Sequence, residues 1–367
     1  MQRSDHRRKA GKIVLSSLGT LFLCAGYAGL AKFCHMLGRN AERRIFISMA
    51  IVSAAVLFTE LFSSAGGRSH PRRAASRILH ITEDILIVAF VLPMGLSVVL
   101  YEGTFFQHRT TPQDVRQSID SSLNVLEIPF RSNTGQMLSG HLYCAGDDDP
   151  DSILIISHGN GVGHIGYMNV IRFFAENGYG VFAYDATGYD DSDGFSTRGL
   201  PQGVIDLDYA IQCVRQNAIT AGKPILLFGH SWGAYAAGAV LNVQPDVTAV
   251  ISLAGFDHSR QIIEYHGRQI VGDAASLLLP HLSLYEWLKF GRYASFSVMD
   301  GFENTGAKII VVHSADDETV PIQFGYERYR KRYGNDDRFM FVRYENRGHE
   351  GLFTDRDARM YLEWLNQ

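Results

Sequence analysis

The sequence has few cysteines and no pattern typical of a metal-binding domain. Only four of the 367 residues are cysteines, which is too few to define a disulfide framework. No CxxC motif and no cysteine–histidine spacing of the structural zinc type is present. These absences exclude a disulfide-rich scaffold, and we expect no structural metal ion.

A strong charge of one sign is also missing. The formal net charge is −4, so no nucleic-acid partner is expected. The phosphate-binding pattern GxxxxGK[ST] is absent as well, and nucleotide binding is not predicted. Basic residues dominate before about residue 80, whereas acidic residues crowd the remainder. A basic, apolar first part and a mildly acidic second part indicate a membrane anchor joined to a soluble domain.

Three apolar runs occupy the first hundred residues. Residues 13–31 and 85–101 contain no charge, and residues 45–62 contain one acid, Glu60. A membrane-spanning helix needs roughly 20 apolar residues, and about 17 suffice. We therefore predict a multi-pass membrane region over 1–105 with two or three spans, a linker over 106–122 and a soluble domain over 123–367.

Each run has an alternative interpretation. The first, with its basic start, also fits a cleaved signal peptide. The second also fits a buried or interfacial helix, because Glu60 must lie near an interface if the run spans. The third also fits a helix on the membrane surface that leads into the soluble domain.

The Lys and Arg residues of the short flanking segments predict the orientation. With three spans, the N-terminal segment and the loop after the second run share one side and outweigh the loop between the first two runs. The first set is Arg3, Arg7, Arg8, Lys9, Lys12, Arg68, Arg72, Arg73 and Arg77, and the second is Lys32, Arg39, Arg43 and Arg44. This predicts a cytoplasmic N-terminus and an extracytoplasmic soluble domain. If residues 45–62 do not span, the domain is cytoplasmic.

From about residue 123 the pattern changes to short β-branched runs that alternate with helical stretches. This alternation is typical of an α/β fold, in which helices cover both faces of a mostly parallel sheet. The first two strands should form a hairpin, and an insertion at about 257–305 separates the sixth and seventh strands. The eight predicted strands are 123–129, 138–143, 153–157, 180–184, 224–228, 247–253, 308–312 and 338–344. The helices predicted between them are 166–177, 203–217, 232–243, 322–332 and 354–365.

The segment Gly229-His230-Ser231-Trp232-Gly233 has the pattern GxSxG. It follows a predicted strand and precedes a predicted helix, which is the context of a nucleophile elbow. Glycines on both sides allow the tight turn that exposes the serine hydroxyl. We therefore predict Ser231 as a catalytic nucleophile.

A nucleophilic serine needs a base, and the base needs an acid that fixes its tautomer. His349 is the only histidine after the last predicted strand, and we predict it as the base. The segment after the seventh strand offers three consecutive acids, Asp316, Asp317 and Glu318. We choose Asp317, with Asp316 as the fallback and Asp257, after the sixth strand, as a third candidate.

The oxyanion of the tetrahedral intermediate needs hydrogen-bond donors. One predicted donor is the backbone N–H of Trp232, which follows the nucleophile. The other comes from the glycine-rich loop His158-Gly159-Asn160-Gly161 after the third strand, and we name Asn160. This chemistry requires no metal and no organic cofactor.

With these motifs, residues 123–367 resemble the α/β-hydrolase superfamily of serine hydrolases. The loop His-Gly-Asn-Gly at 158–161 looks like the membrane-anchored branch that includes lipases and acyl-protein thioesterases. Two further motifs of that branch are matched in part. Its pattern DYRGYGxSxG fits Asp185, Gly188, Tyr189, Ser192 and Gly194, but not Ala186, Thr187 and Asp190; its pattern HGxxDxxVP fits His313, Asp317, Val320 and Pro321, but not Ser314.

The resemblance implies an eight-stranded α/β-hydrolase core whose insertion at 257–305 serves as a lid. Together with the membrane runs, it indicates hydrolysis of a carboxylic ester or thioester, with a lipid-like or acylated substrate and an acyl-serine intermediate. A serine peptidase on the same triad is one alternative. A catalytically idle, membrane-tethered binding module is another. Nothing in the sequence predicts the oligomeric state.

Overall fold

The computed structural model describes residues 82, 90–116, 122–146 and 149–367. The chain divides into two compact units, Met1–Leu86 and Ile87–Gln367. The first two predicted membrane runs and the start of the third lie outside the described residues. Among the residues that are described, no helix is both long enough and apolar enough to span a membrane.

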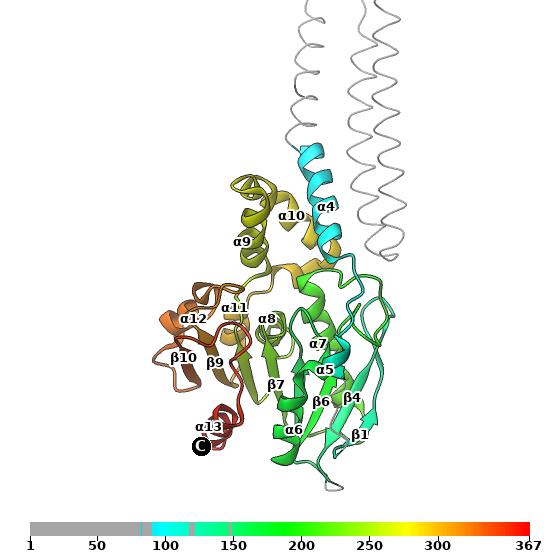
Figure 1. Cartoon of the computed structure of the whole chain (residues 1–367), viewed down its shortest axis with the longest axis vertical. Coiled ribbons are helices and arrows are strands. Elements are labelled where there is room, and N and C mark those ends of the chain that lie inside the picture. The colour runs from blue at the N-terminus through cyan, green and yellow to red at the C-terminus, as the bar shows by residue number, and fades with distance from the viewer. Residues whose placement is uncertain (1–81, 83–89, 117–121, 147–148) are drawn as a thin grey trace, which may run out of the picture. The chain divides into compact units, whose positions relative to one another are not determined.

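The central element of the second unit is an eight-stranded sheet (Figure 1). Its strand order is β1-β4-β6-β5-β7-β8-β9-β10. The pairs β1–β4 and β4–β6 are antiparallel, and the others are parallel. The strands are β1 (Asn124–Glu127), β4 (Gly140–Cys144), β5 (Ser152–Ser157), β6 (Tyr179–Tyr184), β7 (Ile225–His230), β8 (Ala249–Leu253), β9 (Lys308–Ser314) and β10 (Phe339–Tyr344). The predicted eight-stranded, mostly parallel sheet is confirmed.

The predicted opening hairpin contains an additional feature. Strands β1 and β4 pair as expected, but the connection between them holds a small two-stranded sheet of its own. It consists of β2 (Phe130–Arg131) and β3 (Met137–Leu138). A turn at residues 132–136 closes this small sheet, with the Ser132 N–H donating to the Gln136 carbonyl and the Gly135 N–H donating to the Ser132 carbonyl, both at 3.0 Å.

Helices cover both faces of the sheet because its central strands bury side chains on both sides. Ile153 and Ile155 face a core shared with α7 and α8, whereas Leu154 and Ile156 face a core shared with α6. Five helices correspond to the predicted helical stretches: α6 (Met168–Glu176), α7 (Leu200–Gln216), α8 (Trp232–Ala239), α12 (Tyr326–Tyr333) and α13 (Asp355–Leu365). Short helical pieces accompany them: α5 (Gln113–Arg116), η2 (His164–Tyr167), η3 (Val240–Asn242) and η5 (Ile322–Phe324).

The predicted insertion between the sixth and seventh strands is helical. It contains α9 (Ser259–Val271), α10 (Ala274–Phe290), η4 (Gly291–Ser295) and α11 (Val298–Asn304). Gly272 and Gly291 have φ values of 62° and 60° and end α9 and α10, because glycine adopts this left-handed conformation without a steric cost. We refer to α9 and α10 together as the cap hairpin. In Figure 1 it projects from the sheet beside α4.

Helix α4 (Leu92–Phe105) holds the second half of the third apolar run. Pro93 lies in its first turn, where a missing N–H leaves no helical bond unmade. The helix packs against α10 and belongs to the second compact unit. The predicted end of the membrane region, at residue 105, therefore falls inside that unit.

Candidate active site

Ser231 lies in a strained turn between β7 and α8. Its φ of 56° is one of four positive values among non-glycine residues in the described part of the chain, and such strain is typical of functional positions. A Cβ on Gly233 would collide with the backbone of Ser157 and His158, and a Cβ on Gly229 would collide with the backbone of Gly233. The GxSxG pattern is thus required by close backbone packing at the elbow.

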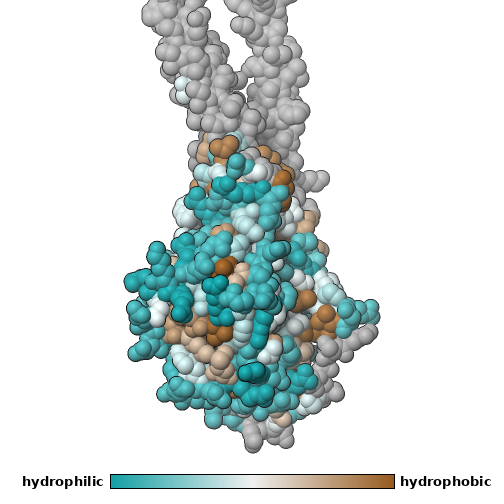
Figure 2. Space-filling view, turned by 60° about the vertical axis from the view of Figure 1, so that its left-hand side comes forward, coloured by the Kyte–Doolittle hydropathy of each residue, from teal (hydrophilic) through white to brown (hydrophobic). Residues whose placement is uncertain are grey.

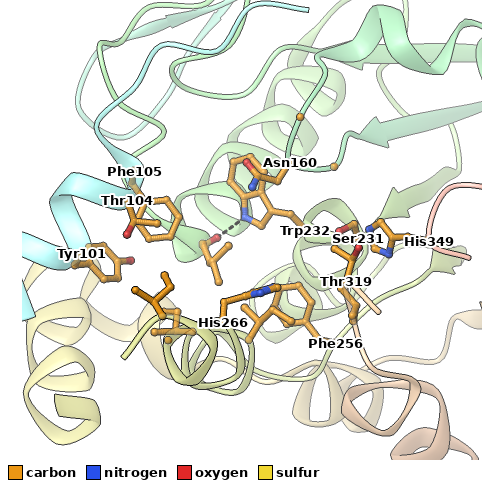
Figure 3. Close-up of a pocket in the computed structure, with 18 of the residues that line it drawn as sticks. Tyr101, Thr104, Phe105, Asn160, Ser231, Trp232, Phe256, His266, Thr319 and His349 are labelled. Carbon is orange, nitrogen blue, oxygen red and sulfur yellow. Dashed lines mark hydrogen bonds between the residues drawn. The ribbon is translucent and has the colours of Figure 1, made fainter. Parts of the chain in front are cut away.

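His349 and Asp317 come from loops that follow neighbouring parallel strands, β10 and β9. Nδ1 of His349 lies 2.8 Å from Oδ2 of Asp317. The other carboxylate oxygen, Oδ1, accepts the backbone N–H groups of Thr319 and Val320, both at 2.9 Å. Figure 3 shows His349 beside Ser231, and both line the same pocket. The structure therefore brings together the three residues predicted as nucleophile, acid and base.

The two alternative acids have other partners. Asp316 accepts hydrogen bonds from the Ser314 hydroxyl at 2.5 Å and from the Gly348 N–H at 3.0 Å. Asp257 accepts the N–H of Met299 and pairs with Arg328 at 3.4 Å. Of the three candidate acids, Asp317 is the one that contacts His349.

The pocket that contains Ser231 and His349 has a volume of about 530 Å³, within the range of roughly 300–1,000 Å³ usual for small-molecule sites. Most of its lining is apolar. The apolar lining residues include Leu100 and Phe105 from α4, Ile262, Ile263 and Ile270 from α9, and Leu278, Leu279 and Leu282 from α10. The predicted lid thus contributes to the pocket, together with α4, for which no such role was predicted.

Comparison with known proteins agrees with this fold. Residues 148–288 match a family model described as serine aminopeptidase, S33. The fold is similar to an esterase from Pyrococcus furiosus, with a TM-score of 0.54 and 18% identity over 71% of this chain and 97% of that one. It is also similar to acetyl xylan esterase 1 from Thermoanaerobacterium, with a TM-score of 0.50 and 15% identity over 72% and 96% of the two chains. No curated protein matches the sequence.

The chain is a serine hydrolase with the α/β-hydrolase fold. Asp317 is also held by a second histidine, His313, which matched only as a motif position in the sequence. His313 Nε2 lies 3.2 Å from Oδ2 of Asp317 and 2.9 Å from the carbonyl oxygen of Val320. Burial by itself would raise the pKa of Asp317. Hydrogen bonds from His313, His349 and the Val320 N–H outweigh that effect and hold the pKa well below its usual range. Asp317 therefore stays ionised beside His349.

A second residue that the sequence analysis missed is His230, the variable position before the nucleophile. The Gly159 N–H donates to the Tyr167 hydroxyl at 2.9 Å, and that hydroxyl lies 2.9 Å from Nδ1 of His230. Nε2 of His230 lies 3.0 Å from the carbonyl oxygen of His349. A neutral His230 protonated on Nε2 satisfies each of these hydrogen bonds, because Nε2–H donates to the His349 carbonyl and Nδ1 accepts the Tyr167 hydroxyl. Burial and the nearby His349 lower the pKa of His230 and favour that neutral form. His230 thus links the turn at Ser231, the loop that carries His349 and the loop at residues 158–161.

Both residues predicted for the oxyanion hole line the pocket near Ser231. Trp232 is the first residue of α8, so its backbone N–H is one of the first-turn groups without a helical acceptor. Its indole N–H donates to the carbonyl of Leu200 at 2.8 Å. The side-chain oxygen of Asn160 accepts from the Tyr189 hydroxyl at 2.6 Å. Because the Gly159 N–H already donates to Tyr167, Asn160 offers the next backbone donor of this loop.

The same loop continues into the spacing GxGxxG at 161–166, which the sequence analysis overlooked. In dinucleotide-binding proteins such glycines leave room for a pyrophosphate. Here the Gly163 N–H donates to the Thr111 hydroxyl at 2.7 Å, and the His164 N–H donates to Asp185 at 2.9 Å. A Cβ on Gly163 would meet the carboxylates of Asp185 and Asp190. Two buried carboxylates occupy the space that a phosphate would need.

One group of potential metal ligands occurs among the described residues: His230, His349 and Glu350, whose ligand atoms lie within 4.8 Å of one another. Both ring nitrogens of His230 and Nδ1 of His349 are already hydrogen-bonded. A metal ion bound by His230 would have to displace the bond of that ring to the Tyr167 hydroxyl or to the His349 carbonyl oxygen. The donor set therefore fits acid–base chemistry better than metal binding.

Proposed function

We propose that this hydrolase cleaves a carboxylic ester or thioester of a lipid-like or acylated substrate. The observation that carries the proposal is the Asp317–His349 pair beside Ser231, at one side of a pocket with a mainly apolar lining. An apolar pocket favours an acyl group, because transfer of hydrocarbon out of water is the dominant favourable contribution to binding.

In the proposed mechanism, the Ser231 oxygen attacks the substrate carbonyl carbon while Nε2 of His349 takes the hydroxyl proton. Asp317 holds the ring through Nδ1 and stabilises the imidazolium. The backbone N–H groups of Trp232 and Asn160 donate to the oxyanion. Collapse of the intermediate breaks the bond to the leaving group, which receives the proton from His349 and departs as an alcohol or thiol. Water, deprotonated by His349, then attacks the acyl-serine; the bond to the Ser231 oxygen breaks, His349 returns the proton to that oxygen, and a carboxylic acid is released.

The proposal includes a multi-pass membrane anchor within residues 1–105. Its support is the set of apolar runs at 13–31, 45–62 and 85–101 and the distribution of Lys and Arg in the segments that flank them. Three spans place the catalytic domain outside the cytoplasm, and two spans place it inside. The proposed lipid-like substrate agrees with this location, since an anchored enzyme meets membrane lipids and acylated proteins at high local concentration.

A second candidate is a peptidase that removes amino-terminal residues, which the description of the matched family model favours. Such an enzyme needs a carboxylate that pairs with the substrate ammonium. Glu350 lines the pocket directly after His349 and is the single carboxylate among the described residues of that lining. The ester proposal remains preferred because the rest of the lining suits an uncharged chain.

The test is a substrate panel on the detergent-solubilised full chain, with Ser231→Ala as the matched control. The panel holds p-nitrophenyl acyl esters, an acyl thioester and aminoacyl p-nitroanilides. We expect turnover of the esters and thioester that disappears in Ser231→Ala, with the anilides cleaved far more slowly. Faster anilide cleavage, lost in Glu350→Gln, would establish the peptidase instead. A folded chain that cleaves nothing would favour the binding module.

A further inference from the structure

Helix α4 forms a wall of the pocket, far from the chemistry. Leu100, Tyr101, Thr104 and Phe105 line the pocket, although α4 precedes the first strand of the sheet. Figure 3 shows Tyr101, Thr104 and Phe105 on the side away from Ser231 and His349, with Trp232 between the two groups. A ligand bound covalently at Ser231 therefore extends toward α4.

The cap hairpin forms the facing wall. Ile263, His266 and Ile270 come from α9, and Leu278 and Leu282 come from α10. None of the described residues from α4 or the cap hairpin that line this part of the pocket carries a carboxylate or ammonium group. Figure 2 shows small apolar patches on an otherwise largely hydrophilic face of the molecule. The groove between α4 and the cap hairpin is thus suited to hydrocarbon.

Buried side chains fix α4 against α10. The Tyr101 hydroxyl of α4 donates to Glu286 of α10 at 2.7 Å, and the Tyr285 hydroxyl of α10 donates to Glu102 of α4 at 2.5 Å. Lys289 of α10 forms an ion pair with Glu102, and both side chains are fully buried. Each helix therefore donates a tyrosine hydroxyl to a glutamate of the other, which sets both their register and their rotation.

Two further bonds tie this cluster to the rest of the hydrolase. Lys289 donates to the carbonyl oxygen of Arg198 at 2.7 Å, in the segment that leads into α7. The Ser259 hydroxyl, at the start of α9, donates to Glu286 at 3.0 Å. The wall formed by α4 is consequently a fixed part of the pocket, with a defined distance from Ser231.

We propose that the groove between α4 and the cap hairpin binds the acyl chain of the substrate, and that Leu100 and Thr104 of α4 determine how long a chain is accepted. The inference rests on the proposed acyl-serine function and names the residues that select its substrate. Leu100 and Thr104 are four residues apart and share one face of α4. The Thr104 hydroxyl donates back to the Leu100 carbonyl at 2.8 Å, so its methyl group is free to contact an apolar ligand.

The experiment compares two substitutions that add the same ring to the same helix. Thr104→Phe narrows the groove. Val99→Phe is the matched control, because Val99 is 54% exposed and points about 140° away from Thr104 around the helix. Reaction of Ser231 with alkyl fluorophosphonates of increasing chain length measures chain acceptance without any need for turnover. Hydrolysis of p-nitrophenyl butyrate, laurate and palmitate provides the second readout.

We expect Thr104→Phe to slow reaction with the longest chains about tenfold or more relative to butyl, because each excluded methylene loses roughly 0.8 kcal/mol of burial and 1.4 kcal/mol corresponds to a factor of ten. Val99→Phe should leave the profile unchanged, and Leu100→Ala should shift it toward longer chains. Equal slowing at every chain length, or equal effects of the two phenylalanines, would overturn the inference while the serine hydrolase stands. Failure of Ser231 to react with any probe would overturn the proposed function together with the inference.

Discussion

At the Ser231 end of the pocket, the backbone sets the positions of the reactive groups. The serine lies in a turn that two glycines make possible, and the acid and base follow adjacent strands. At the α4 end, side chains set the geometry, through a buried cluster that joins α4, α10 and the segment before α7. Geometry that the backbone sets, as at the Ser231 end, changes little when a surface side chain is replaced. The geometry at the α4 end depends on a few charged groups, and a buried charge without its partner costs several kcal/mol.

The largest effect should come from the catalytic end. Asp317→Asn keeps the shape of the side chain but removes the charge that stabilises the imidazolium and favours the wrong tautomer of His349. We expect kcat for ester hydrolysis to fall on the order of 10⁴-fold, with the thermal unfolding midpoint measured alongside to show that the fold persists.

Asp316→Asn is the matched control for that substitution. Asp316 lies next in the chain but contacts Ser314 and Gly348 instead of His349. Its replacement should change kcat only a few-fold. A larger loss in Asp316→Asn than in Asp317→Asn would show that the acid has been assigned to the wrong residue.

Stability should be most sensitive at the α4 end. Lys289→Met leaves Glu102 charged and buried, so we expect a loss of about 3–5 kcal/mol in the free energy of unfolding. The double variant Glu102→Gln, Lys289→Met removes both charges and should recover most of that loss. The unfolding free energies of the three chains in denaturant provide the measurement. If the single and double variants are equally destabilised, the cluster acts through packing and not through charge.

Glu286 gives the smaller, pH-dependent prediction. Burial raises the pKa of Glu286 from 4.5 to about 7, so between these values the folded chain keeps a proton that the unfolded chain releases. Stability therefore falls as the pH rises through this window, by about 3 kcal/mol when complete. Glu286→Gln cannot ionise and should melt at a higher temperature than the natural chain near pH 8, and at a similar temperature near pH 5.

Glu264→Gln controls for the loss of any carboxylate in the cap hairpin. Glu264 pairs with Arg268 on the surface of α9, and exposed pairs of this kind contribute little to stability. Its replacement should not produce a difference that grows with pH. A Glu286→Gln chain that melts like the natural chain at both pH values would contradict the buried, raised-pKa carboxyl.

The difference between the two ends also explains what the sequence could predict. The elbow, the succession of strands along the chain and the position of His349 follow from local patterns: GxSxG, buried β-branched runs and a histidine after the last strand. The sequence favours Asp317 over Asp316 without a geometric reason. In the structure Asp317 contacts His349, whereas Asp316 accepts the Ser314 hydroxyl.

The α4 wall could not be predicted in the same way. Residues 92–105 are apolar, and an apolar run fits a membrane span, a surface helix or a pocket wall equally well. The choice depends on partners about 185 residues away in α10, such as Glu286 for Tyr101, and no local pattern connects the two. His230 shows the same limit, because the variable position of GxSxG carries no spacing that would reveal its bonds to Tyr167 and His349.

The most direct test of the account is labelling of the detergent-solubilised chain by a fluorophosphonate probe, with Ser231→Ala and His349→Ala as comparisons. An activated serine beside its base predicts rapid labelling of the natural chain, no labelling of Ser231→Ala and labelling slowed at least about a thousandfold in His349→Ala. A folded natural chain that does not react, or labelling that survives in Ser231→Ala, would contradict the assignment of Ser231 as the nucleophile.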